Sequence, residues 1–108
     1  MADFDTKTAM AAMTASSDEA AALMRALSNG SRLLILCHLA ASGELTVGTL
    51  VERVGVSQSA LSQHLAKLRE QGLVAYRRDS QMLHYRVADP RALQVLELLH
   101  SIYCPDLA

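Results

Sequence analysis

The sequence predicts a mainly α-helical domain that carries one β-hairpin ahead of its last helix. Two observations support this order: apolar residues recur at helical spacing in the stretches before Gly72, and they then alternate with polar residues over two short stretches that follow it. The 108 residues are 51% hydrophobic, 4% aromatic and 19% charged, which allows one aliphatic core and excludes a disordered chain.

A first helix is predicted from Ser16 to about Leu27. Ser16 and Glu19 have the spacing of a capping box, and the alanine, leucine and methionine residues that follow favour a helix. Asn29-Gly30 is expected to end this helix, because both residues tolerate the left-handed conformation.

A second helix is predicted to begin after Ser31, which is suited to cap it, and to stop near Ser42-Gly43. Its residues from Leu33 to Leu39 are apolar nearly all round the helix. A helix of this kind is expected in the centre of its domain.

The stretch from Thr46 to Gly72 predicts two helices joined by a tight turn. Thr46 and Ser57 are suited to cap them, Gly55 permits the turn and Gly72 ends the second. The longer helix has an apolar stripe of Leu61, Leu65 and Leu68, and its outer side carries Gln58, Ser59, Ser62, Gln63, Lys67 and Arg69. Two helices around a glycine turn, the second with a polar outer face, form the helix-turn-helix unit that binds DNA.

Two strands, from Leu73 to Arg78 and from Met82 to Val87, are predicted around a turn at residues 79–81. A hairpin directly behind a helix-turn-helix is a wing, so the predicted fold is a winged helix-turn-helix. Asp89-Pro90 opens the last helix, and Pro105 closes it. The first and last helices hold more apolar residues than one small domain can bury, which predicts a homodimer.

Charge is distributed unevenly along the chain. The formal net charge is −1, but seven basic residues stand against three acidic ones between Arg53 and Arg91, a balance of +4, and the remainder carries −5. The near-neutral total therefore conceals a basic segment suited to nucleic acid.

The polar face of the fourth helix and the tip of the hairpin are the candidate DNA contacts. Short hydroxyl and amide side chains suit phosphates and base edges, and no glutamate interrupts the helix before Glu70. The candidates are Ser57, Gln58, Ser59, Ser62, Gln63, His64, Lys67, Arg77, Arg78 and Gln81. The alternatives are a solvated helix face, a strand edge defended by charge, and a His64 that braces the turn. His84, within a strand, is interpreted as a wing or packing residue.

These motifs resemble the ArsR/SmtB family of small winged-helix repressors over about residues 19–104. The similarity is carried by the stretches 27–36 and 45–50, and above all by Ser-Gln-Ser-Ala-Leu-Ser-Gln-His-Leu at 57–65. It implies a dimer that binds operator DNA and leaves it when an inducer binds. The metal-binding residues of the family's sensors are missing, because residues 44–50 hold no thiol and Arg91 stands where a histidine is expected. The resemblance thus implies no metal and no cofactor.

Two cysteines, Cys37 in the second helix and Cys104 at the end of the last, resemble those of the persulfide-responsive branch of the family. In that branch, a cysteine in each of these helices forms a disulfide or a longer sulfur bridge. The pair is therefore expected to be a sensor of reactive sulfur or of redox state.

Other roles for the two cysteines remain open. Cys37 is alternatively a small buried apolar residue. A metal-responsive repressor is the nearest rival, because His100 and Cys104 are four residues apart and His38 neighbours Cys37. A small thiol oxidoreductase is disfavoured, since no CxxC motif is present. A winged helix used only for protein contacts is a further possibility.

One domain is predicted, residues 17–104, between a flexible N-terminal extension, 1–16, and a C-terminal tail, 105–108. No secretory signal or membrane span is evident, so a cytoplasmic protein is expected. The predicted function is that of a homodimeric repressor, not an enzyme, that binds operator DNA when reduced and releases it when Cys37 and Cys104 are bridged.

Overall fold

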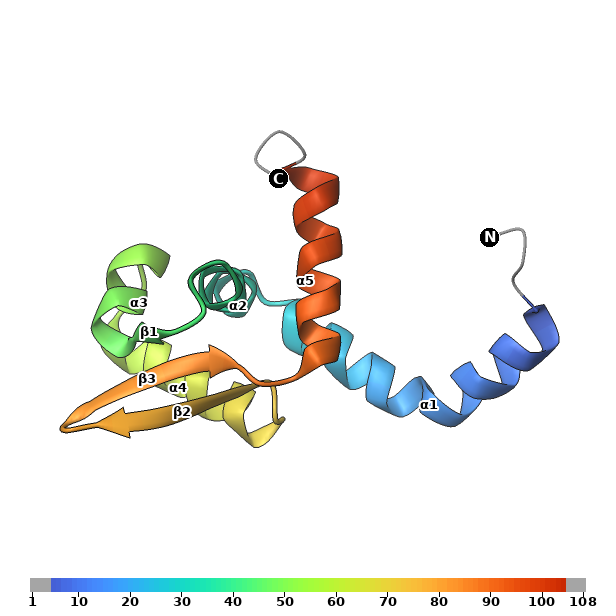
Figure 1. Ribbon diagram of the computed structural model, residues 1–108, viewed down its shortest axis with the longest axis horizontal. Helices are drawn as coiled ribbons and strands as arrows, with labels where there is room; N and C mark the ends of the chain where they lie inside the picture. The colour runs from blue at the N-terminus through green and yellow to red at the C-terminus, as the bar shows by residue number, and fades with distance from the viewer. Residues whose placement is uncertain (1–4, 105–108) are drawn as a thin grey trace.

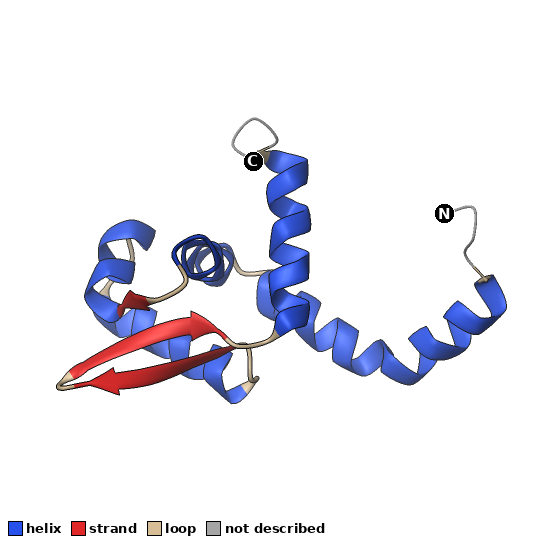
Figure 2. Ribbon diagram, viewed as in Figure 1, coloured by secondary structure: helices blue, strands red, loops and turns tan. Residues whose placement is uncertain are grey.

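The structure, a computed structural model, describes residues 5–104. Its elements are α1 (Thr6–Leu27), α2 (Gly30–Ser42), β1 (Leu45–Thr46), α3 (Val47–Val54), α4 (Gln58–Glu70), β2 (Val74–Asp79), β3 (Met82–Val87) and α5 (Pro90–Tyr103). The helix-turn-helix, the hairpin wing behind it and the final helix confirm the predicted winged fold (Figures 1 and 2). The predicted closure of the last helix by Pro105 falls outside the described residues.

Helix α1 begins ten residues earlier than predicted, at Thr6. The carboxylate of Asp5 accepts hydrogen bonds from the backbone N–H of Thr8 at 3.3 Å and from its hydroxyl at 2.8 Å, so Asp5 is the N-cap. Ser16 lies inside the helix, and residues 6–16, predicted as an extension, are helical. The reason is that an alanine-rich run has no stop signal, so it propagates from the upstream cap.

The junction between α1 and α2 also differs from the prediction. Helix α1 ends at Leu27 as expected, but Asn29 is extended, with φ −97°, and caps α2 in place of Ser31. The side-chain carbonyl of Asn29 accepts from the backbone N–H of Arg32 at 3.1 Å. Arg32 then donates through Nε to the carbonyl of Ala26 at 3.0 Å and through Nη2 to that of Arg25 at 3.2 Å. These two bonds go to carbonyl oxygens in the last turn of α1, which receive no hydrogen bond from a residue four positions later in the helix.

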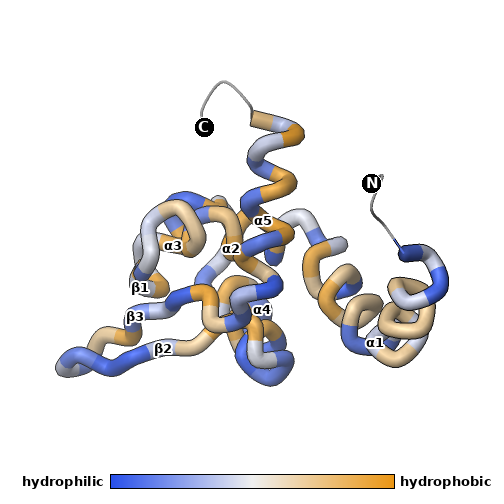
Figure 3. Tube along the Cα trace, turned by 45° about the vertical axis from the view of Figure 1, so that its right-hand side comes forward, coloured by the Kyte–Doolittle hydropathy of each residue, from blue (hydrophilic) through white to orange (hydrophobic). Residues whose placement is uncertain are grey.

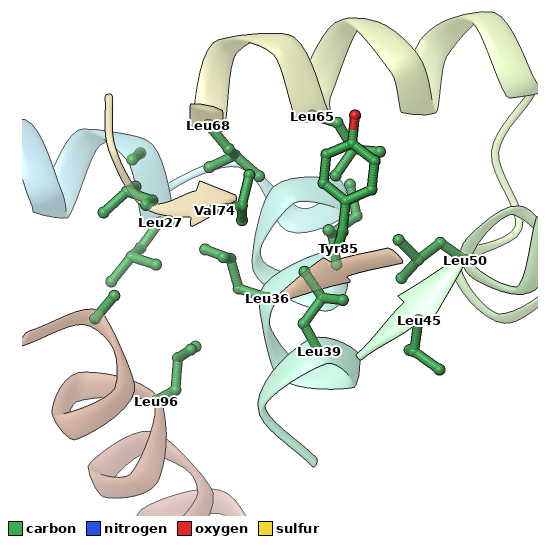
Figure 4. Close-up of a cluster of buried hydrophobic side chains, with 14 of the residues drawn as sticks. Leu27, Leu36, Leu39, Leu45, Leu50, Leu65, Leu68, Val74, Tyr85 and Leu96 are labelled. Atoms are coloured by element: carbon green, nitrogen blue, oxygen red, sulfur yellow. The ribbon is translucent and has the colours of Figure 1, made fainter. Parts of the chain in front are cut away.

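The hydrophobic core lies around α2 (Figure 4). Ile35, Leu36 and Leu39 are fully buried, and the predicted stripe of α4 buries Leu61, Leu65 and Leu68 against them. The central position of α2 is thus confirmed. Burial on all its sides is not, because Leu34 remains 48% exposed.

The strands form one antiparallel sheet in the order β1-β3-β2. The hairpin turns at Ser80, which has φ +56°, within the predicted turn at residues 79–81. Strand β1 was not predicted. It exists because Leu45 pairs with Tyr85 and Thr46 with His84 on β3, a contact that no local pattern reveals.

Helix α5 stands up from the domain, and the start of α1 extends away from it (Figure 1). Apolar residues continue along both helices where they leave the core (Figure 3). The large exposed apolar side chains on them are Met10, Met13, Met24, Leu98, Ile102 and Tyr103. Among the described residues, no helix is long and apolar enough to cross a membrane.

Candidate nucleic-acid interface and thiol pair

Helix α4 is positioned by the turn that precedes it. Gly55 adopts the left-handed conformation with φ +79° at the end of α3, where a side chain would be strained. Ser57 then caps α4, since its hydroxyl accepts from the backbone N–H of Ala60 at 3.1 Å. Ser57, a predicted DNA contact, therefore also stabilises the start of α4.

The outer face of α4 is polar and accessible. Gln58, Ser59, Ser62, Gln63 and Lys67 are all exposed, opposite the buried leucine stripe. A groove of about 320 Å³ runs between α4, the start of α3 and the wing. It brings together two predicted contacts of α4, Gln58 and Ser62, with a third, Gln81 of the turn, which is distant from them in sequence.

His64 differs from its neighbours on α4, because it is only partly exposed. Burial lowers the pKa of its imidazole, and the positive charges of Arg32 and Lys67 lower it further. The neutral imidazole is therefore favoured. Whether His64 contacts DNA or braces the turn stays a prediction.

The wing carries its predicted basic residues, but one of them is already paired. Nε of Arg77 lies 3.0 Å from both Oε1 and Oε2 of Glu44, the residue that precedes β1. Arg78 and Gln81 are exposed at the tip. The Glu44–Arg77 contact could not be predicted from local spacing, because the two residues are 33 positions apart in the sequence.

Other basic residues of the segment 53–91 also have partners. Arg91 donates to Asp89 through Nη2 at 3.2 Å and to Glu19 of α1 through Nη1 at 2.8 Å. The guanidinium carbon of Arg69 lies 5.0 Å from the centre of the Tyr76 ring. Two of the seven basic residues of this segment, Arg77 and Arg91, are thus paired with carboxylates among the described residues, so fewer positive charges are available to DNA than the balance of +4 suggests.

Cys37 and Cys104 are both free thiols. Cys37 is exposed, so the alternative that it is a buried packing residue is wrong; Cys104, at the C-cap of α5, is half-buried. Partial loss of water around the Cys37 side chain raises the pKa of its thiol, and the negative charge of an ionised Cys104 raises it further. The second effect reflects the position of Cys104 at the end of α5, the helix that packs against α2.

A groove between α2 and α5 is lined by Cys37, and Cys104 is not among its lining residues. Its volume is about 350 Å³, and its lining comprises Cys37, Ala40 and Ala41 of α2 with Leu96, Glu97, His100 and Ser101 of α5. Cys104 follows His100 by four residues, at the C-cap of α5, and its backbone N–H donates to the carbonyl of His100. Within residues 5–104, no three His, Cys, Asp or Glu side chains gather closely enough to hold a metal ion.

Comparison with known proteins decides the class of this chain. Residues 23–76, from the end of α1 to the first strand of the wing, match the family model described as "Bacterial regulatory protein, arsR family". The chain belongs to the ArsR family. Its members are DNA-binding regulators, as predicted here, and the helix-turn-helix lies inside the matched region.

Individual ArsR-family relatives match nearly the whole chain. The HTH-type transcriptional regulator YgaV of Escherichia coli K12 is 41% identical over 98 residues, 91% of this chain and 99% of YgaV. The transcriptional activator HlyU of Vibrio cholerae is 46% identical over 92 residues, 85% of this chain and 84% of HlyU. The crystal structure of the transcriptional repressor BigR from Xylella fastidiosa has a TM-score of 0.82 at 37% identity, and covers 88% of this chain and 96% of that one.

Proposed function

We propose that this ArsR-family chain is a homodimeric repressor that binds operator DNA as the free dithiol and releases it when Cys37 and Cys104 become joined by a sulfur bridge. The observation that supports the proposal is an exposed Cys37 thiol at the groove between α2 and α5, with Cys104 four residues beyond His100, which lines the same groove. The effect of the Cys104 charge on the pKa of Cys37 supports their proximity.

The bridge forms in two thiol-exchange steps. The Cys37 thiolate attacks the terminal sulfur of an organic persulfide, so a new S–S bond forms on Cys37 while the donor's S–S bond breaks and the donor leaves as a thiolate that takes a proton from water. The Cys104 thiolate then attacks Sγ of Cys37 and expels hydrosulfide. Two protein thiols are oxidised by two electrons, and the persulfide is reduced to a thiol and hydrogen sulfide.

The dimer supplies the connection to DNA. The exposed apolar side chains of α1 and α5 are suited to a second copy of the chain, which would place two α4 helices at successive major grooves. Helix α2 packs against α4 and β3 as well as against α5. A bridge that ties α2 to α5 therefore acts on both the DNA-binding unit and the dimerising helix.

The test is DNA binding before and after sulfur treatment. Fluorescence anisotropy with a DNA fragment from upstream of the chain's own gene should show that the reduced protein binds. The logarithm of the binding constant should fall linearly with the logarithm of the salt concentration. Treatment with an alkyl persulfide should weaken binding by about 5- to 150-fold, the usual span of coupling between two sites.

The variants Cys37→Ser and Cys104→Ser should keep their affinity after the same treatment. Ser101→Ala is the matched control, because Ser101 lies in the same groove but has no thiol. Its hydroxyl donates to the carbonyl of Leu98 at 2.8 Å, and its loss should leave the response intact. If either cysteine variant released DNA as readily as the parent, the proposed mechanism would be wrong.

A further inference from the structure

The groove beside Cys37 is larger than the approach of one sulfur atom requires. Its volume of about 350 Å³ is above the lower end, roughly 300 Å³, of sites that hold small organic ligands. The hollow exists because α2 presents two alanines, Ala40 and Ala41, where longer side chains would fill the space against α5.

The lining of this groove is mainly apolar at its base. Leu96 is 4% exposed and forms the buried side together with the half-buried Ala40, whereas Ala41, Glu97, His100 and Ser101 are exposed. An organic group that enters here exchanges water for methyl and methylene contacts directly beside the Cys37 sulfur. Apolar surface removed from water in this way favours binding.

The charges at the groove disfavour anions. Glu97 contributes a carboxylate and His100 an imidazole, and neither lysine nor arginine is among the seven described residues that line it. A donor that carries several carboxylates would be repelled by Glu97, with no lysine or arginine in the described lining to offset that repulsion. A donor with a neutral hydrocarbon group would not.

We propose that the groove between α2 and α5 binds the apolar organic group of the sulfur donor, and so makes Cys37 selective for alkyl persulfides over anionic ones such as glutathione persulfide. This inference rests on the proposed sensing function and specifies its ligand. In the bound donor the hydrocarbon lies against Leu96 and the alanines, and the terminal sulfur faces Cys37.

The selectivity is measurable as a rate ratio. Methyl, n-butyl and glutathione persulfide are each reacted with the reduced chain, and formation of the bridge is followed by mass spectrometry. Each rate is then divided by the rate at which the same donor reacts with N-acetylcysteine, which corrects for the donor's own reactivity. Each methylene that enters the groove should favour reaction by up to about fourfold. The corrected rate for n-butyl persulfide should therefore exceed that for methyl and glutathione persulfides by about tenfold or more.

Two variants locate the effect in the groove. Ala41→Leu fills the hollow at an exposed helical position, so it should abolish the n-butyl preference while the chain stays folded. Ala66→Leu is the matched control on the exposed side of α4, and should keep the preference. Glu97→Gln should raise the glutathione persulfide rate by about two- to fivefold without changing the n-butyl rate.

Equal corrected rates for the three donors, or an n-butyl preference that survives Ala41→Leu, would overturn this inference while leaving the sensing function in place. Failure of every donor to form the bridge in the parent chain would instead contradict the proposed function. The two failures are thus distinct.

Discussion

Glu44 holds Arg77 through both of its carboxylate oxygens, each 3.0 Å from Nε. The pair ties the middle of β2 to the residue that precedes β1, and both side chains keep partial access to solvent, 52% for Arg77 and 34% for Glu44. A phosphate near the wing must therefore compete with Glu44 for the same guanidinium.

Replacing Glu44 with glutamine should strengthen DNA binding. The substitution removes a negative charge near the wing and leaves Arg77 available to phosphate, so we expect the affinity for the upstream fragment to rise about three- to tenfold at low salt. The folded state should lose less than about 1 kcal/mol, because the pair is largely exposed. Anisotropy titrations and urea unfolding measure the two effects.

Glu52→Gln is the control for Glu44→Gln. Glu52 is exposed on α3, so the variant has the same net charge but does not touch Arg77. An equal gain in affinity for both variants would show that total charge, and not release of Arg77, determines the effect.

Replacing Cys104 with serine should lower the pKa of the Cys37 thiol. Burial raises this pKa first and the Cys104 charge adds to it, so the variant removes the second cause and keeps the first. A lower pKa means more thiolate at a given pH, and Cys37 should react faster with iodoacetamide. The pH profile of alkylation, followed by peptide mass spectrometry, should shift towards lower pH. An unchanged profile would show that the two thiols do not interact.

Asp89 should stabilise the fold in a pH-dependent way. Its carboxylate caps α5 through the Arg91 backbone N–H at 2.8 Å, and hydrogen bonds from the Arg91 side chain are the largest cause that lowers its pKa. Asp89→Ala should cost about 1 kcal/mol at neutral pH, and Asp89→Asn less, because asparagine also caps helices well.

The pH dependence of the Asp89 contribution follows from the lowered pKa. The stabilisation is fully present above the ordinary aspartate pKa and is lost as the pH falls through the lowered value in the folded chain. Urea unfolding of the parent and Asp89→Ala should therefore converge in acid. A difference that stays constant with pH would contradict this account.

Gln58 and Lys67 should affect DNA binding differently if α4 lies in the major groove. Lys67→Gln should reduce the slope of log affinity against log salt by about 1 and weaken all sequences alike. Gln58→Ala should leave the slope unchanged and cost about 1–3 kcal/mol on the specific fragment alone. Equal losses on specific and random DNA for Gln58→Ala would exclude base contact.

Features determined by neighbouring residues were predictable from the sequence. Gly55 and Ser57 define the turn before α4, and the leucines of α4 define its buried side, because each signal acts within about two helical turns. The start of α1 was missed, since both Asp5 and Ser16 are suited to cap it and only the continuing helix shows that Asp5 does.

Features that depend on distant partners were not predictable. Glu44 meets Arg77 and Glu19 meets Arg91 across 33 and 72 residues, so no spacing in the sequence indicates either pair. The exposure of Cys37 could not be predicted for a similar reason. Helix α2 is apolar nearly all round, and only the positions of its neighbours determine which side meets the core.

Intact mass spectrometry after separate exposure to an alkyl persulfide and to peroxide, under non-reducing conditions, tests the central claim most directly. We expect the persulfide to yield a single chain in which Cys37 and Cys104 are linked to each other, with added sulfur mass wherever the bridge is longer than a disulfide. Peroxide should add no sulfur mass. A chain that keeps two alkylatable thiols after persulfide, or that is linked only to other chains, would contradict the account.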